Sequence, residues 1–475
     1  MSRHNALDAM VLILGLGSLL AWQLVTPPVW HHGEAREGLV VQDIVQNGHW
    51  ILPRRNGELP SKPPFFHWQA AVAMRLFGSS DAMLRLPSAV AALATALATY
   101  VLGVELGGLL TGRLAVGALL GMVPFWVSAG EARVDMVFAA AITVALAGFY
   151  VWDRHGMPWA RALCYAGGAA AVLAKGPAGA AIPVLVVVTF LAADGRLERL
   201  RELFDLRWLL AALVADVAWY ALAAADGGSA FLHLQLFHEN IERFVGSDAF
   251  HRSGRGASGR MIVVLLASLL PWSLALLASA VRRWRGTRLA VGERFVHAWW
   301  LVVLALFTVA AGKRAVYILP ACPAVALVAG WTLARLVEER APLGGNARTV
   351  VAPRSAAKLM VLALLLFDLA AVVALQTVRA KHARRASLSG FAETVQSTVP
   401  AGAPLFAAEG LQRNELLVLA YRTRRPIPRQ DAGLVAGAYY LVPDADTGAP
   451  EWSDATVLAK SARRRGPNVA LMLAR

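Results

Sequence analysis

Long apolar runs, each followed by a short polar segment, make up the chain as far as residue 378. A bilayer core about 30 Å thick requires roughly 20 apolar residues for each helix that crosses it. The pattern therefore predicts a mainly α-helical, multi-pass membrane protein with about eleven spans. The spans are expected near residues 8–26, 82–104, 112–129, 135–152, 159–174, 177–193, 208–225, 259–280, 295–311, 316–336 and 357–378.

The rest of the chain, residues 379–475, is more polar and has a different pattern. A helix is expected near residues 388–398, and short runs typical of β-strands follow it. These runs are Pro404–Ala408, Gly437–Val442, Ala455–Lys460 and Asn468–Leu473. We therefore predict two domains, a membrane domain of residues 1–378 with a first outer loop at 27–81, and a small α/β domain of residues 379–475.

Arginine-rich segments between the spans predict the orientation of the chain. Three of these segments are residues 194–207, 281–294 and 335–358. If the spans alternate across the membrane, all three segments lie on the same side as the N-terminus. Lys and Arg in short loops favour the cytoplasmic side. The N-terminus is therefore expected in the cytoplasm and the α/β domain on the outer, periplasmic side. The first span lacks a small-residue cleavage site, so we expect it to remain as an anchor.

Composition narrows the class of protein further. Of the 475 residues, 57% are hydrophobic and only 16% are charged, which excludes an ordinary soluble enzyme. The 46 Lys and Arg residues outnumber the 31 Asp and Glu residues. No nucleic-acid motif accompanies this excess, and the basic residues lie between apolar runs, so membrane lipid head groups or phosphates are the expected partners. Cys164 and Cys322 lie within apolar runs and offer neither a disulfide framework nor a zinc cluster.

Glu34 lies in the first outer loop, at the start of an amphipathic stretch. Val40, Val41, Ile44 and Val45 share one face of this stretch, which predicts a helix lying on the membrane surface. The positive end of a helix dipole favours an ionised carboxylate. Glu34 is therefore a candidate general base at the depth of lipid head groups. The alternative is that Glu34 merely caps the helix.

Other charged residues gather in the segments predicted to face outward. Lys62 precedes two prolines and suits a lipid phosphate, although a lysine that snorkels to the surface would look the same. Asp135 enters an apolar span, and such a carboxylate usually faces a cavity or a partner, for which Arg133 is a candidate. Lys175 stands in a Lys-Gly-Pro turn between two apolar runs. Further candidates are Arg36, His238, Glu239, Arg243, Lys313, Arg314 and Tyr317.

Carboxylates and cations collected at membrane depth are what transfer from a lipid-phosphate donor requires. A base orients or deprotonates the acceptor, and cations neutralise the departing phosphate. No spacing of the HExxH type occurs, so neither a metal nor another cofactor is expected. No Walker or dinucleotide glycine pattern occurs either, which argues against a nucleotide donor. The alternative from another class is a lipid or solute transporter, but transporters place ionisable residues near the bilayer midplane, often in paired repeats.

The outer motifs, taken in order, resemble those of the aminoarabinose transferase and protein O-mannosyltransferase group of GT-C glycosyltransferases. The resemblance covers residues from about 30 to 325. It rests on Glu34-Ala35-Arg36, Gly48-His49-Trp50-Ile51-Leu52-Pro53-Arg54, Lys62-Pro63-Pro64, Ala132-Arg133-Val134-Asp135, Ala174-Lys175-Gly176-Pro177, Glu239-Asn240-Ile241-Glu242-Arg243-Phe244, Leu270-Pro271-Trp272, Gly312-Lys313-Arg314 and Tyr317-Ile318-Leu319-Pro320.

The resemblance implies a GT-C fold and an enzyme of a bacterial inner membrane that uses a polyprenyl-phosphate sugar. It implies that Glu34 is the catalytic acidic residue, that Asp135 is a carboxylate that supports Glu34 or faces the acceptor, and that Lys62 and Arg243 hold the donor phosphate. A single displacement would invert the anomeric carbon, and the acceptor would be lipid A, an envelope glycan or a protein hydroxyl. Many relatives have Asp-Glu where this chain has Gly33-Glu34. One acidic candidate is therefore missing, which leaves a catalytically silent scaffold as a third hypothesis.

Overall fold

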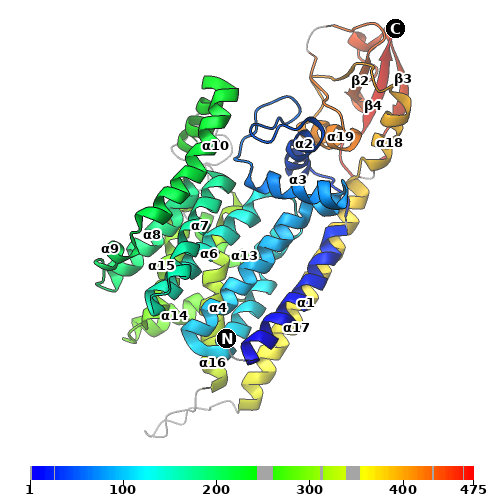
Figure 1. The fold of residues 1–475 in the computed structure, drawn as a ribbon. Helices are drawn as coiled ribbons and strands as arrows, with labels where there is room; N and C mark the ends of the chain where they lie inside the picture. The colour runs from blue at the N-terminus through cyan, green and yellow to red at the C-terminus, as the bar shows by residue number, and fades with distance from the viewer. Residues whose placement is uncertain are drawn as a thin grey trace.

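A bundle of long helices carries a small β-sheet at one end (Figure 1). The structure, a computed structural model, describes residues 3–25, 27–242, 260–310, 314–338, 354–430, 433–463 and 465–475. The bundle helices are α1 (Arg3–Val25), α4 (Asp81–Gly121), α5 (Val123–Ala129), α6 (Val134–His155), α7 (Pro158–Lys175), α8 (Ala178–Ala193), α10 (Leu206–Leu232), α13 (Arg260–Ser268), α14 (Leu274–Trp284), α15 (Val291–Val309), α16 (Cys322–Glu338) and α17 (Arg354–Ala386). The described residues of the eleven apolar runs lie mainly on these helices, and the run at 316–336 begins on the 3-10 helix Ala315–Ala321.

The helix α4 contains two of the predicted spans because the chain reverses within it. Gly107 and Gly108 leave helical geometry, and Gly108 has a φ of 85°, which a residue with a side chain rarely adopts. The two arms then pack tightly, since a Cβ on Gly103 would lie 2.6 Å from the Cα of Gly112. The segment between the two predicted spans, from residue 104 to residue 112, is therefore a tight turn that joins two helical arms.

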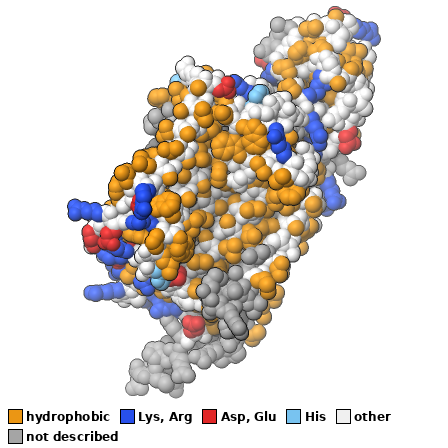
Figure 2. All heavy atoms as spheres, viewed as in Figure 1, with side chains coloured by type: hydrophobic (Ala, Val, Ile, Leu, Met, Phe, Trp, Pro, Cys, Tyr) orange, Lys and Arg blue, Asp and Glu red, His pale blue; other side chains and the backbone are white. Residues whose placement is uncertain are grey.

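Hydrophobic side chains cover the flank of the bundle, while charged side chains gather toward its two ends (Figure 2). Within the described residues, six helices are long and apolar enough to cross a membrane. Among them, the apolar part of α6 is almost entirely buried, which places α6 inside the bundle. The remaining predicted spans lie on shorter or interrupted helices such as α8, α13 and α14.

The outer loop folds into two helices, α2 (His32–Asn47) and α3 (Phe65–Phe77). The expectation that the apolar face of α2 rests on the membrane is wrong. Its apolar residues Val41 and Ile44 are fully buried, and α2 packs against α3 and against α19 (Arg413–Thr423) from the end of the chain. The apolar face of α2 is thus covered by protein.

The end of the chain forms a four-stranded sheet close to the predicted runs. The strands are β1 (Leu405–Ala407), β2 (Tyr439–Pro443), β3 (Ala455–Lys460) and β4 (Val469–Ala474). Their order is β1-β2-β4-β3, with β1 and β2 parallel and the other neighbours antiparallel. The helix α18 (Ser389–Thr398) matches the predicted helix, and α19 connects β1 to β2.

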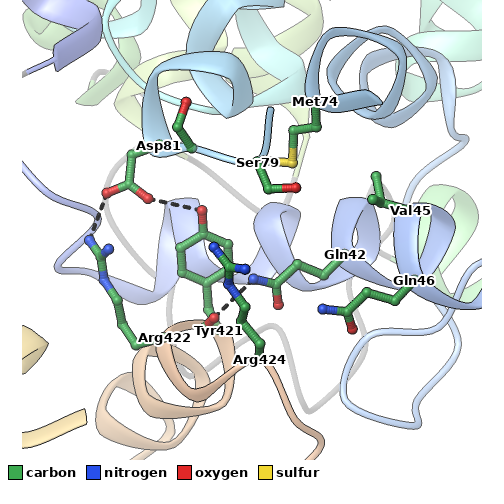
Figure 3. Close-up of a pocket in the computed structure, with 10 residues that line it drawn as sticks. Gln42, Val45, Gln46, Met74, Ser79, Asp81, Tyr421, Arg422 and Arg424 are labelled. Atoms are coloured by element: carbon green, nitrogen blue, oxygen red, sulfur yellow. Dashed lines mark hydrogen bonds and ion pairs between the residues drawn. The ribbon is translucent and has the colours of Figure 1, made fainter. Parts of the chain in front are cut away.

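A polar junction joins α19 to α2 and to the start of α4 (Figure 3). The Tyr421 hydroxyl donates to Asp81 Oδ1 over 3.0 Å, and Arg422 Nη2 donates to Asp81 Oδ2 over 2.7 Å. Gln42 donates to the Tyr421 carbonyl over 2.9 Å. These bonds enclose a cavity of about 350 Å³, where Asp81, the one carboxylate among its lining residues, is already paired. They fix the sheet end of the chain to the outer loop.

Candidate functional site

A second cavity, of about 110 Å³, opens where α2, the start of α6 and the end of α7 meet the short 3-10 helix Ala315–Ala321. Eight side chains singled out in the sequence line it: Arg36, Lys62, Arg133, Asp135, Lys175, Glu239, Arg314 and Tyr317. Apolar residues complete the wall, among them Phe138, Phe307 and Val316. Positions as far apart in the sequence as Arg36 and Tyr317 therefore converge on one place.

Asp135 stands in the first turn of α6, where the positive end of the helix dipole favours a carboxylate. The Lys175 ammonium lies 2.5 Å from its Oδ1, and Arg133 Nε lies 3.4 Å from its Oδ2. The ammonium of Lys175 also lies over the rings of Phe138 and Tyr317, at 4.9 and 4.8 Å. Asp135 is nearly buried and faces the cavity, held between two cations.

Lys62 and Glu239 form a second ion pair in the same cavity. Lys62 Nζ lies 2.8 Å from Glu239 Oε2, and both side chains are nearly buried. Lys62 comes from the stiff loop before α3, whereas Glu239 lies on the π-helical segment His233–Glu242. Since each end of the pair comes from a separate element, an anionic ligand can compete with Glu239 for Lys62.

The cavity carries an excess of positive charge. Its lining includes five cations, Arg36, Lys62, Arg133, Lys175 and Arg314, and only two carboxylates. Arg36 Nε donates to Glu37 over 2.9 Å, and the neighbouring Glu37 carboxylate raises the pKa of Arg36. A cavity of this charge, with an apolar wall, suits a phosphate attached to a hydrophobic chain.

Glu34 is placed differently from the expectation. Its side chain is only 1% exposed and does not line the cavity. Arg85 Nε and Nη2 donate to its two oxygens over 2.7 and 2.8 Å, and the Ala132 backbone N–H donates over 2.9 Å. The expectation that Glu34 lies open to an acceptor is therefore wrong, because a bidentate buried ion pair occupies both oxygens.

Sequence reasoning missed several residues that support the site. Glu37 lies buried between Arg36 and His67, whose Nε2 is 2.8 Å from Glu37 Oε2. Glu131 pairs with Arg133 over 3.5 Å and with Arg379 of α17. Arg85, the partner of Glu34, could have been found from the sequence, because a cation within an apolar run requires a partner.

Of three further predicted binding residues, one lies away from the cavity and two fall outside the residues that the structure describes. His238 does not line the cavity, and its Nδ1 lies 2.8 Å from Glu242 Oε2 instead. Arg243 and Lys313 lie outside the described residues. Within the described part of the chain, no group of three or more His, Cys, Asp or Glu side chains is arranged to hold a metal ion.

Known proteins share both sequence and fold with this chain. Residues 61–220 match the dolichyl-phosphate-mannose-protein mannosyltransferase family. The undecaprenyl phosphate-α-4-amino-4-deoxy-L-arabinose arabinosyl transferase of Shewanella sediminis is 29% identical over 66% of this chain and 57% of its own length. The enzyme of that name from Pseudomonas aeruginosa is 30% identical over 70% of this chain and 60% of its own length.

Solved structures give the same result for the fold. The crystal structure of ArnT from Cupriavidus metallidurans bound to undecaprenyl phosphate aligns over 97% of both chains with a TM-score of 0.78 and 18% identity. The oligosaccharyltransferase AglB of Archaeoglobus fulgidus aligns over 94% of this chain and 70% of its own, with a TM-score of 0.55 and 12% identity. Matches to the first curated relatives span only 57–61% of their length. The resemblance indicated by the motifs is nevertheless confirmed: this chain is similar in sequence to the aminoarabinose transferases and has the GT-C fold of ArnT.

Proposed function

We propose that this protein is a glycosyltransferase that moves a sugar from a polyprenyl phosphate to an acceptor at the end of the bundle bearing α2. One observation carries the proposal: a single cavity combines five cations, two carboxylates and an apolar wall. The cations suit the donor phosphate, and Phe138, Phe307 and Val316 suit the start of its hydrocarbon chain. The names of the relatives support undecaprenyl phosphate as the carrier.

The ion pairs suggest how the donor would engage. A donor phosphodiester entering the cavity competes with Glu239 for Lys62 and with Asp135 for Lys175, and it competes more strongly as its bond to the sugar breaks, because a second negative charge then develops on the phosphate. Asp135 is then released to face the acceptor. The acceptor oxygen attacks the anomeric carbon, the bond from that carbon to the phosphate oxygen breaks, and polyprenyl phosphate leaves. Asp135 takes the proton of a hydroxyl acceptor, or orients an acceptor that is already ionised. One displacement inverts the anomeric carbon.

In this scheme Glu34 is a positioning residue. Its ion pair with Arg85 and its bond to the Ala132 N–H tie the start of α2 to α4 and to the segment before α6. That segment carries Arg133, and α2 carries Arg36, so both cations depend on this tie for their positions. The absence of an acid at residue 33 then leaves Asp135 as our choice for the base.

A transporter is disfavoured by where the charges lie. Asp135 stands at the first turn of α6 and Lys175 at the last residue of α7, so the site is at one end of the bundle. Transport sites lie near the bilayer midplane. A site at one end of the bundle allows the donor and the acceptor to meet at the membrane surface, as a transfer between lipids requires.

Lys62→Gln should weaken donor binding roughly tenfold to hundredfold, because a hydrogen bond to a charged group contributes about 1.5–3 kcal/mol. Lys62→Arg keeps the charge and should retain most of the affinity. Affinity for undecaprenyl phosphate is measured by competition on the purified protein, and Lys460→Gln serves as the control, since Lys460 lies on β3 and pairs with Asp444. Unchanged affinity in Lys62→Gln would show that Lys62 does not touch the donor.

We also propose that the chain crosses a bacterial inner membrane eleven times, with its N-terminus in the cytoplasm and residues 379–475 in the periplasm. After Cys164 and Cys322 are replaced, Ser397→Cys in α18 and Thr287→Cys shortly after α14 each supply one thiol, and α18 and α14 lie toward opposite ends of the molecule (Figure 1). An impermeant thiol reagent should label residue 397, and not residue 287, in intact spheroplasts. The opposite labelling would reverse the orientation.

The proposed activity is tested on the purified protein with an undecaprenyl-phosphate-linked, radiolabelled 4-amino-4-deoxy-arabinose. The acceptors are lipid A, an envelope glycan and a Ser/Thr-rich peptide, each supplied separately. Label should move to one acceptor with release of an equal amount of undecaprenyl phosphate. Failure with all three acceptors, while the donor binds, would contradict the proposed transfer to these classes.

A further inference from the structure

Glu37 is a buried carboxylate that the proposed mechanism does not use. It follows Arg36 on α2, it is only 3% exposed, and it does not itself line the reaction cavity. Its Oε1 accepts hydrogen bonds from Nε and Nη2 of Arg36, and its Oε2 lies 2.8 Å from Nε2 of His67. One oxygen of Glu37 is therefore engaged by a cation of the cavity, and the other by a histidine that is 1% exposed.

His67 connects this carboxylate to the element that follows Lys62. It stands in the first turn of α3, which begins directly after the segment Lys62-Pro63-Pro64. Burial alone would raise the pKa of Glu37, but the charge of Arg36 and the hydrogen bond of His67 lower it, so the carboxylate is ionised. An ionised carboxylate only accepts hydrogen bonds, so Nε2 of His67 carries a proton and donates it to this bond. The contact thus ties α2 to the start of the neighbouring α3 (Figure 1).

Arg36 has other carboxylates near it, and Glu37 determines which of them it binds. The charge of Glu37 is the main cause of the raised pKa of Arg36, and the charges of Asp135 and Glu239 add to it. Both of these carboxylates line the same cavity as Arg36. Because Glu37 holds Nε and Nη2, it keeps the guanidinium from turning toward Asp135. Nη1 of Arg36 makes no hydrogen bond to any residue that the structure describes, so it can donate to an anion in the cavity.

We propose that Glu37 and His67 are positioning residues that orient the guanidinium of Arg36 toward the donor phosphate. The inference rests on the proposed function and deepens it, since it names the groups that set the direction of one of the cavity's cations. A guanidinium is planar, so fixing Nε and Nη2 also fixes the direction of Nη1. A donor group that is oriented in advance loses less side-chain freedom when the ligand binds.

This positioning role has the opposite sign from a simple effect of charge. Glu37→Gln removes a negative charge close to the cavity, which by Coulomb attraction alone would strengthen the binding of an anion. We expect the variant instead to bind undecaprenyl phosphate about tenfold more weakly, because Arg36 is released and turns toward Asp135 or Glu239. A purely structural role of Glu37 would leave the affinity of the folded protein unchanged.

The test measures the affinity for undecaprenyl phosphate by competition on purified variants, after thermal denaturation has shown that each is folded. Arg36→Gln should weaken binding roughly tenfold to hundredfold. Glu37→Gln added to Arg36→Gln should cause no further loss, since two residues that act as a unit are not additive. His67→Leu should resemble Glu37→Gln. His67→Gln supplies an N–H close to the place of Nε2 and should restore most of the affinity.

Glu293→Gln is the matched control for the change at Glu37. Glu293 is also nearly buried and paired with an arginine, since Arg282 Nη1 lies 3.1 Å from its Oε1. It stands in the first turn of α15 and does not line the reaction cavity. This variant loses the charge of a buried ion pair in the same way, so it should bind undecaprenyl phosphate like the wild type even where its stability is lower.

Each outcome decides a separate point. Unchanged or stronger binding in folded Glu37→Gln would overturn the positioning role, as would an equal loss in the wild-type and Arg36→Gln backgrounds. If Glu37→Gln does not fold, the two His67 variants decide, and wild-type affinity in His67→Leu would overturn the proposal. If the wild type transfers sugar while these affinities stay constant, the proposed function survives and the inference fails. If the wild type binds undecaprenyl phosphate but transfers sugar to no acceptor, the proposed function fails, while the affinities still decide what orients Arg36.

Discussion

Asp135→Asn is expected to lower turnover by about 10²–10⁴-fold, the usual contribution of a positioned general base. Asparagine keeps the shape of the side chain but neither accepts a proton nor carries the charge that orients an acceptor. Donor affinity should be maintained, because Lys175 loses its competing carboxylate and becomes more available to the phosphate. The measurement is the single-turnover rate together with donor affinity on the same purified variant.

Asp446→Asn is the matched control for this experiment, because Asp446 is an exposed acid in the sheet end of the chain. It should behave like the wild type in both measurements. Near-normal turnover in Asp135→Asn would contradict the assignment of the base, and Glu239 would then be the remaining carboxylate in the cavity.

Glu34→Gln is expected to destabilise the fold by about 3–5 kcal/mol, because it leaves the Arg85 guanidinium buried without a counter-charge. A double variant, Glu34→Gln with Arg85→Met, removes the orphaned charge and should recover most of the loss. Thermal denaturation of the purified protein reports both effects. If Glu34→Gln is as stable as the wild type but inactive, the ion pair is not structural and Glu34 returns to a role in the chemistry.

The same ion pair predicts how stability changes with pH. Burial alone would raise the pKa of Glu34, but the charge and hydrogen bonds of Arg85 outweigh it and lower the pKa from 4.5 to about 2. A carboxyl with a lowered pKa in the folded state contributes stability that is fully present above pH 4.5 and is lost as the pH falls toward 2. Glu34→Gln should therefore show a smaller loss of stability than the wild type over this acidic range.

Periodicity and apolar length predicted most of the helices and all four strands, because these depend on patterns within one segment. They predicted the helix α2 but not that its apolar face is covered by protein, and they did not predict α19, which packs against α2. In α19 the consecutive residues Leu416, Leu417, Val418 and Leu419 are all buried. Such a run has no amphipathic period, so nothing in the local sequence distinguishes it as a helix covered on several sides.

The candidate site was predictable as a set of residues but not as a geometry. The motifs brought Asp135, Lys62 and Lys175 into consideration, and the structure brings them into one cavity. The motif around Glu34 did not reveal Arg85, which lies 51 residues later and occupies both carboxylate oxygens. Partner choice between distant charges depends on how helices pack, which a single sequence does not specify.

The central claim, that the cation-rich cavity holds the donor phosphate, is tested most directly by determining the structure of the protein with undecaprenyl phosphate. The account predicts that the phosphate lies within hydrogen-bonding distance of Lys62 and Lys175, with Glu239 displaced from Lys62. A phosphate bound away from Lys62 and Lys175, with both ion pairs of the cavity intact, would contradict it.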